Sequence, residues 1–431
     1  MRSMRSRFKA PLQRTSAIHR LGKSNTKTGS RSTTLKSLSA AATAICNGLI
    51  NALILAVSAH RGDVDEIAVY AIANSVIPLA AIIAGGGAPL LYVSGNEEQR
   101  TSVRSQWVFV VLPTLVATTS AYSFFYAERG YSFSLLLAAG SVAVLNNASQ
   151  LQLGDLSRQM RVGAAAAVVC GSKAIALALT FQSFGLNTAL LIAGIIQFAL
   201  AEVALRKTSW MRPRVLRTLS FMDAVRAHSM NRNLFSYSLA ELLSGRISTI
   251  ALSLSASSRT MGAFGTVVSI YQAMGGVLYT ALQVPMAAKS RVRQKLDDLH
   301  RVGRSSEAVV IVGASVAAPA VILVSRYLTD SVLHLPQPEA AIWLTLAASA
   351  LPFFVINRAI MLDHIGNGKY LSANLYAWLV TSSICAALLG LMPAFGFTGA
   401  ASAALAGELF AALVAAVLAA RKRIKPKPLP A

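Results

Sequence analysis

Apolar runs and short polar segments alternate along the chain from residue 39 to residue 420. A transmembrane helix needs about 20 predominantly apolar residues. Because lipid offers no hydrogen-bond partners to the backbone, each such run is expected to form a helix. The pattern predicts an all-α integral membrane protein with twelve transmembrane helices. Their expected ranges are 39–59, 66–92, 106–125, 132–151, 163–181, 185–204, 234–255, 262–286, 307–329, 340–360, 371–392 and 398–420.

Composition and the placement of charge support this topology. The chain is 54% hydrophobic and only 13% charged, whereas soluble domains have about 25% charged residues. With both termini in the cytoplasm, 34 of the 40 Lys and Arg residues fall in inner segments and four in outer ones, as the positive-inside rule predicts. The net charge of +23 then faces the anionic lipids of the inner leaflet, so no nucleic-acid partner is expected. The predicted location is the inner (cytoplasmic) membrane of the cell.

Landmarks that recur in the same order suggest that the two halves of the chain are related. They are Phe184-Gly185-Leu186 with Phe395-Gly396-Phe397, Asp155 with Asp363, and Pro89 with Pro285. Six helices per half give a parallel repeat, and ligands of such transporters lie between the halves near the midplane. The expected domains are a disordered basic cytoplasmic tail (1–36), an N-terminal six-helix bundle (37–204), a basic cytoplasmic linker (205–233), a C-terminal six-helix bundle (234–420) and a second basic tail (421–431).

The apolar segment 234–255 carries two charges, Glu241 and Arg246. A charge at the bilayer centre costs about 2.5–3.5 kcal/mol on insertion scales, so both side chains must face protein or a wet cavity. They are five residues apart, which separates them by about 140° around a helix. Each therefore needs a partner on another helix.

Lys173, near the centre of 163–181, is the second buried cation. Lys173 and Arg246 come from different halves, and together they could clamp an anionic headgroup, most simply a phosphate, across the interface. A guanidinium suits bidentate contact with phosphate. The structural alternative is that each cation pairs with an acid, Glu241 or Glu408, on another helix.

Glu241 and Glu408 are interpreted either as ion-coupling carboxylates or as structural partners of the two cations. Asn47, Asn51 and Asn74 could bind sugar hydroxyls, although Asn in membrane helices commonly bonds to neighbouring helices. Three further charges are expected near helix ends, where long side chains reach the interface, and are given no special role. They are Glu202, Arg326 and Arg358.

No catalytic constellation is apparent. Cys46, Cys170 and Cys385 each lie in an apolar segment without a neighbour at metal-ligand spacing, so no disulfide framework, metal site or cofactor is predicted. Connections predicted to lie outside are short, which argues against a membrane enzyme acting on external substrates.

Several stretches resemble the oligosaccharide flippases of polysaccharide biosynthesis, within the multidrug/oligosaccharidyl-lipid/polysaccharide exporter superfamily. They are the acidic turn Asp63, Asp65, Glu66 followed by AVYAIANSVIPLAAIIAGGGAPLL, then GAFGTVVSIYQAMGGVLYTALQVPMAAKSR and FGFTGAASAALAGELF. The resemblance covers about 37–423. It implies a V-shaped pair of six-helix bundles that moves undecaprenyl-pyrophosphate-linked sugar units outward by alternating access, with Lys173 and Arg246 placed to hold the pyrophosphate. The first helix lacks the charged pair of the peptidoglycan-precursor members, which argues against that cargo.

The sequence therefore predicts a flippase for lipid-linked oligosaccharide, with glycosyltransferases or a polymerase of the same pathway as possible partners. Two alternatives stay open. One is a cation-coupled multidrug exporter of the same architecture, for which Glu241 or Glu408 would be essential. The other is a membrane scaffold of a glycan-assembly complex that transports nothing.

Overall fold

The computed structural model describes residues 46–85, 97–158, 161–205, 216–230, 232–295, 299–335 and 337–424. All regular structure in these ranges is helical. The predicted tail 1–36, residues 425–431, Pro89 and the first part of the linker lie outside them. The helices are Cys46–His60, α2 (Val64–Gly85), α4 (Glu97–Gln106), η1 (Trp107–Val111), α5 (Leu112–Ala127), α6 (Phe133–Arg158), α7 (Val162–Phe181), α8 (Leu186–Leu205), α10 (Phe221–Met230), α11 (Arg232–Ser253), α12 (Ser258–Lys295), α13 (Leu299–Tyr327), η2 (Leu328–Val332), α14 (Ala340–Gly366) and α15 (Tyr370–Ile424).

Every predicted apolar segment corresponds to a helix where its residues are described. Eight of the described helices are long and apolar enough to cross a membrane, and the chain is an all-α, multi-pass membrane protein. Two predicted segments, 371–392 and 398–420, form one 55-residue element, α15, which breaks at Gly396 with φ 54° and ψ −127°. The two parts fold back on each other, because Gly407 lies against the backbone of Ile384.

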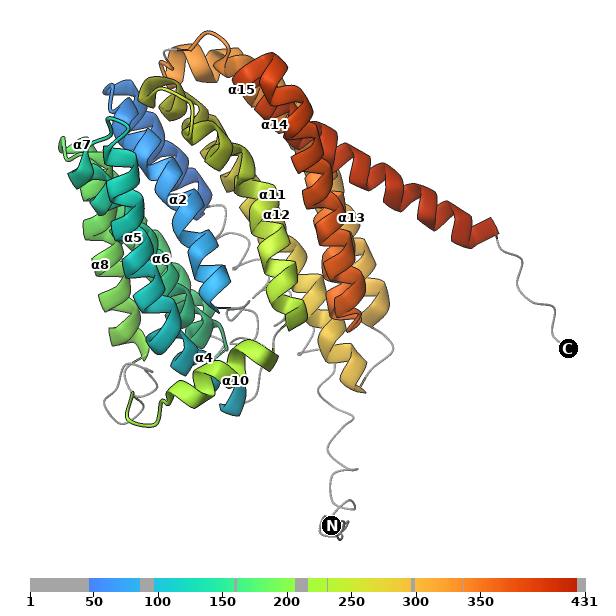
Figure 1. Cartoon of the computed structure of the whole chain (residues 1–431). Helices are drawn as coiled ribbons and strands as arrows, with labels where there is room; N and C mark the ends of the chain where they lie inside the picture. The colour runs from blue at the N-terminus through green and yellow to red at the C-terminus, as the bar shows by residue number, and fades with distance from the viewer. Residues whose placement is uncertain are drawn as a thin grey trace, which may run out of the picture.

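Two groups of helices lie side by side (Figure 1). We call residues 46–205 the N half and 232–424 the C half. In Figure 1, α5 to α8 lie on one side and α13 to α15 on the other, with α2, α11 and α12 between them. The halves meet where α2 packs against both α11 and α12.

The two ends of the bundle differ. We call the end with the turns at 61–63, 128–132 and 254–257 the closed end, and the end where α2 and α6 finish and α11 begins the open end. Polar contacts stabilise the closed end within the N half. The Glu66 carboxylate accepts the backbone N–H of Asn187 at 2.9 Å, which places negative charge at the N-terminus of α8, where the helix dipole favours it.

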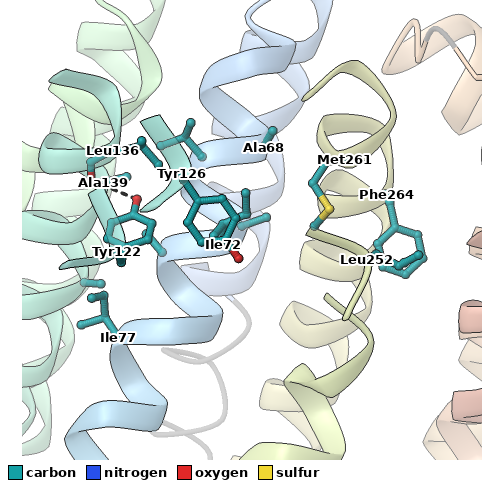
Figure 2. Close-up of a cluster of buried hydrophobic side chains, with 14 of the residues drawn as sticks. Ala68, Ile72, Ile77, Tyr122, Tyr126, Leu136, Ala139, Leu252, Met261 and Phe264 are labelled. Atoms are coloured by element: carbon teal, nitrogen blue, oxygen red, sulfur yellow. Dashed lines mark hydrogen bonds between the residues drawn. The ribbon is translucent and has the colours of Figure 1, made fainter. Parts of the chain in front are cut away.

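One buried apolar cluster crosses the interface between the halves at the closed end (Figure 2). Its members include Ala68, Ile72, Tyr126, Leu252, Met261 and Phe264. They come from α2, α5, α11 and α12, and therefore from both halves. Burial of these apolar side chains stabilises the contact between the two halves at the closed end.

Candidate functional site

A cavity of about 320 Å³ lies between the halves, walled by helix Cys46–His60, α2, α11 and α12. We call it the polar cavity, because amides, hydroxyls and one guanidinium make up much of its lining. These polar residues are Asn47, Asn51, Tyr70, Asn74, Ser75, Arg246, Thr249, Ser269 and Gln272. The three asparagines proposed from the sequence as sugar contacts therefore line one cavity together with Arg246.

Two side chains of the polar cavity lack a strong polar partner among the described residues. The Oδ1 atom of Asn47 is buried and has no hydrogen-bond partner among the described residues. A buried acceptor without a donor costs about 1–3 kcal/mol. Within the described chain Arg246 forms no ion pair, and it interacts electrostatically with the hydroxyl of Tyr70. An unpaired cation and an unfilled acceptor suit a ligand that is both anionic and hydroxylated.

A larger cavity of about 500 Å³ adjoins the polar cavity and extends toward the open end. The two cavities share Arg246, Gln272 and Gly276. Aromatic rings of Trp107, Tyr271 and Phe354 line the larger cavity. A polar chamber joined to an apolar one could accommodate the polar and apolar parts of an amphiphile.

Arg358 is one of the residues that line the larger cavity, and it is the centre of a buried polar cluster. Its side chain is 2% exposed and lies 3.6 Å from the Glu241 carboxylate and 4.0 Å from that of Glu408. It also donates to Ser244 Oγ at 2.8 Å and stacks over the Phe354 ring at 4.6 Å. The arginine of α14 thereby ties α11 to α15.

Further hydrogen bonds fix the second carboxylate of this cluster. Asn357 donates to the carboxylate of Glu408 at 2.5 Å and to its backbone carbonyl at 2.9 Å. Tyr376 in turn donates to Asn357 Oδ1 at 2.6 Å. Glu408 is buried with a 3% exposed side chain, whereas the Glu241 side chain is 23% exposed and lines the larger cavity.

The structure corrects the expectation for Arg358. It was assigned to a helix end and counted in an inner segment, because the apolar run was expected to stop at residue 360. α14 instead continues to Gly366, so Arg358 lies inside the helix, where the carboxylates of two other helices neutralise it. The acids therefore pair with Arg358, and neither of them pairs with Lys173 or Arg246.

Lys173 lies apart from the site. It is half-buried in α7, a helix that packs against α6 and α8, and it lines neither of the two cavities. No acid pairs with it in the part of the chain that the structure describes. The predicted clamp of Lys173 and Arg246 around one headgroup is therefore not formed in this structure.

The other two charges lie near helix ends, as expected: Glu202 near the end of α8 and Arg326 near the end of α13. Glu202 accepts a hydrogen bond from Gln152 at 2.5 Å. Arg326, with a 90% exposed side chain, pairs with Asp330 at 3.6 Å.

Polar and ring contacts join the two halves at the closed end. The Tyr126 hydroxyl and Ser253 Oγ are 2.6 Å apart, and Arg129 donates to the Leu254 carbonyl at 2.5 Å. The rings of His60 and His334 also meet across the halves, 4.7 Å between centroids. The halves are thus in contact at the closed end, and the larger of the two cavities reaches Gly85 at the open end.

Solved structures of transporters share this fold. The lipid II flippase MurJ, in an inward closed conformation, has 13% identity over 92% of this chain and 88% of its own, with a TM-score of 0.56. A multidrug resistance MATE family transporter of the MOP superfamily, in an inward-facing conformation, has 13% identity over 88% and 96%, with a TM-score of 0.57. The eukaryotic MATE transporter AtDTX14 has 15% identity over 93% and 97%, with a TM-score of 0.51.

No protein-family model and no curated protein sequence matches the chain. The structural likenesses cover nearly the whole chain, although the sequences have diverged widely. The chain therefore has the fold of the MOP-superfamily exporters, as the resemblance in its sequence predicted.

Proposed function

We propose that the chain is a flippase that moves a lipid-pyrophosphate-linked oligosaccharide across the cytoplasmic membrane by alternating access. The observation that carries this proposal is the polar cavity between the halves, which Arg246 lines together with Asn47, Asn51 and Asn74. Arginine suits a phosphate group, and amides suit sugar hydroxyls. The adjoining larger cavity offers apolar walls to the lipid end of the same molecule.

In this proposal the open end faces the cytoplasm, and both chain termini lie on that side. The substrate enters from the inner leaflet while the closed end stays sealed. Separation of the halves at the closed end and their approach at the open end would then present the same cavity to the outside. The chain makes and breaks no covalent bond in this cycle.

Arg246→Ala tests the proposal most directly, with Lys173→Ala as the matched control. Both cations lie within membrane helices, but only Arg246 lines the cavities. In proteoliposomes that contain a fluorescent lipid-diphosphate oligosaccharide, an impermeant reductant bleaches the molecules in the outer leaflet and so measures translocation. Arg246→Ala is expected to abolish translocation, whereas Lys173→Ala keeps it. Equal loss in both variants would contradict the assignment of the anion to Arg246.

Binding can be measured separately from translocation. Trp107 lines the larger cavity, so geranyl diphosphate should change the tryptophan fluorescence, and Trp107→Phe should remove that change. Loss of a charge-assisted hydrogen bond costs about 1.5–3 kcal/mol, so Arg246→Ala should weaken binding roughly 10- to 150-fold. An unchanged dissociation constant would show that another group holds the diphosphate.

A protein that acts only as a scaffold would give no translocation in the proteoliposome assay.

One observation favours a second candidate, a cation-coupled multidrug exporter. The Glu241 carboxylate lies partly exposed in a cavity lined by aromatic rings, and such rings attract organic cations. Arg358 between the two acids counts against it, because it already neutralises the charge that a coupling ion or a cationic drug would seek. Absence of drug efflux by the unmodified chain would eliminate this candidate, and efflux unaltered by both Glu241→Gln and Glu408→Gln would show that neither carboxylate couples it to a cation.

A further inference from the structure

The helix α10 in the linker between the halves has an exposed apolar face. The face consists of Phe221, Met222 and Val225, which are 60%, 74% and 50% exposed. Met222 and Val225 follow Phe221 by one and four positions, so the three side chains lie on one side of the helix. The other side of α10 is buried, since Ala224 and Ala227 are 1% and 2% exposed. This short helix packs against α4 and η1, so its orientation relative to the bundle is fixed.

The position of α10 along the bundle matches the depth of lipid headgroups. The candidate span that joins most of α4 to η1 and α5 runs for 28 residues, from Arg100 to Ala127, which corresponds to about 42 Å of helix. The hydrocarbon core is only about 30 Å thick. Because the span becomes apolar at Trp107, α4 projects beyond the core at the open end. α10 lies across the open end beside α4 (Figure 1).

The charge around α10 complements an anionic surface. Between residues 206 and 232 the sequence has seven Lys or Arg residues, and Asp223 is its one acid. Arg217 is exposed, and the Arg226 side chain is 63% exposed and 3.8 Å from Asp223. An amphipathic helix with basic residues beside its apolar face typically lies in the membrane interface and favours anionic lipids.

We propose that α10 is an in-plane membrane helix. Its Phe221–Met222–Val225 face inserts into the leaflet at the open end, while Arg217 and Arg226 contact anionic phospholipid headgroups. Under the proposed orientation this is the cytoplasmic leaflet. The placement of α10 does not depend on the identity of the transported molecule.

In-plane insertion has a consequence for the cavity. α10 packs against α4 and η1. η1 contributes Trp107 and Val111 to the wall of the larger cavity. The helix also precedes α11, the first helix of the C half, by a single residue. Anchored to the lipid and to the N half, α10 would keep the cavity wall at the membrane surface while α11 moves.

Fluorescent labels at two positions of α10 test this proposal in the full chain. Phe221→Cys and Arg226→Cys are made after Cys46, Cys170 and Cys385 are replaced by Ser. The two sites are matched, because both are about equally exposed in the protein and lie about 140° apart around the helix. Val225→Cys replaces Phe221→Cys if that variant does not fold. Each labelled protein is placed in nanodiscs of phosphatidylglycerol or of phosphatidylcholine.

The label at residue 221 is expected to emit at shorter wavelength and to be quenched by lipids with a nitroxide on the acyl chain. The label at residue 226 should be quenched by aqueous iodide instead. The blue shift at 221 should be smaller in phosphatidylcholine, which lacks anionic headgroups. Iodide quenching of both labels without quenching by lipid would overturn the insertion, and an identical shift in the two lipids would overturn the role of the arginines. Transport is not measured, so these outcomes are independent of the proposed function.

Discussion

Arg358 shows how one residue can hold three membrane helices in register. A guanidinium can serve two carboxylates at once because its five donors lie in one plane. Here it faces Glu241 of α11 and Glu408 of α15 from its own place on α14. Removing one member of a buried ion pair leaves a charge without compensation, which costs more than the intact pair contributes.

Arg358→Met is therefore expected to destabilise the protein strongly. The loss in the free energy of unfolding should be about 3–5 kcal/mol, measured by denaturation in detergent micelles. The matched control is Arg326→Ala, which removes a solvent-exposed pair with Asp330 and should cost no more than about 1 kcal/mol. Adding Glu241→Gln and Glu408→Gln to Arg358→Met should recover much of the loss. An effect of Arg358→Met no larger than that of the control would contradict this role.

At the residue scale, sequence reasoning identified which side chains are unusual but not which of them meet. Arg246 and the three asparagines were identified because a polar side chain in an apolar membrane helix requires a polar partner or a wet cavity. All four line the polar cavity. The 140° between Glu241 and Arg246 also indicated partners elsewhere, and Glu241 has one in Arg358. Lys173 was placed in the site because its depth was known while the direction of its helix face was not. Arg358 was missed because the end of α14 was set six residues too early.

Among the elements, α12 approaches α2 closely at a glycine. A Cβ atom on Gly262 would collide with the backbone carbonyl of Val64, so the contact between the halves at this point requires a residue without a side chain. Gly265 approaches the Ala71 side chain in a similar way one turn later, where an added Cβ would lie 2.7 Å away. Small residues at such positions allow membrane helices to pack backbone to backbone.

Gly262→Ala is expected to force α12 away from α2 and to destabilise the protein by about 1–3 kcal/mol, as overpacking does. Gly313→Ala is the control, since a Cβ there meets nothing within 4 Å and alanine favours a helix. Thermal unfolding of both variants in the same detergent makes the comparison. If Gly262→Ala were as stable as Gly313→Ala, the close approach of the two helices would not be required.

The apolar pattern predicted the spanning helices well because every span must hide its backbone from lipid. It did not predict α4 and α10, which lie at the open end. α10 has only 10 residues, and its face of Phe221, Met222 and Val225 is too short to register as an apolar run. Such helices form because a neighbour buries one face, here α4, and that neighbour is not visible in the sequence.

At the scale of the whole molecule, the two halves touch at one end and enclose cavities toward the other. A transporter that works by alternating access must break the contacts of the closed end in every cycle. The ring contact of His60 with His334 is suitable for a test, because the two residues belong to different halves and meet at that end. A link between them would hold the halves in the state described here.

In a cysteine-free background, a short bifunctional thiol reagent should link the His60→Cys/His334→Cys variant and stop translocation of the lipid-linked oligosaccharide. Cleavage of the linker by a reductant should restore it, because the link prevents opening without damaging the fold. The control is the Thr260→Cys/Gln337→Cys pair, whose native side chains are 3.1 Å apart at the same end but within the C half. Linking this pair should leave translocation intact, since the halves remain free to separate. Full activity with the His60 and His334 positions linked would mean that the closed end does not open during transport, and alternating access would then be the wrong mechanism for this fold.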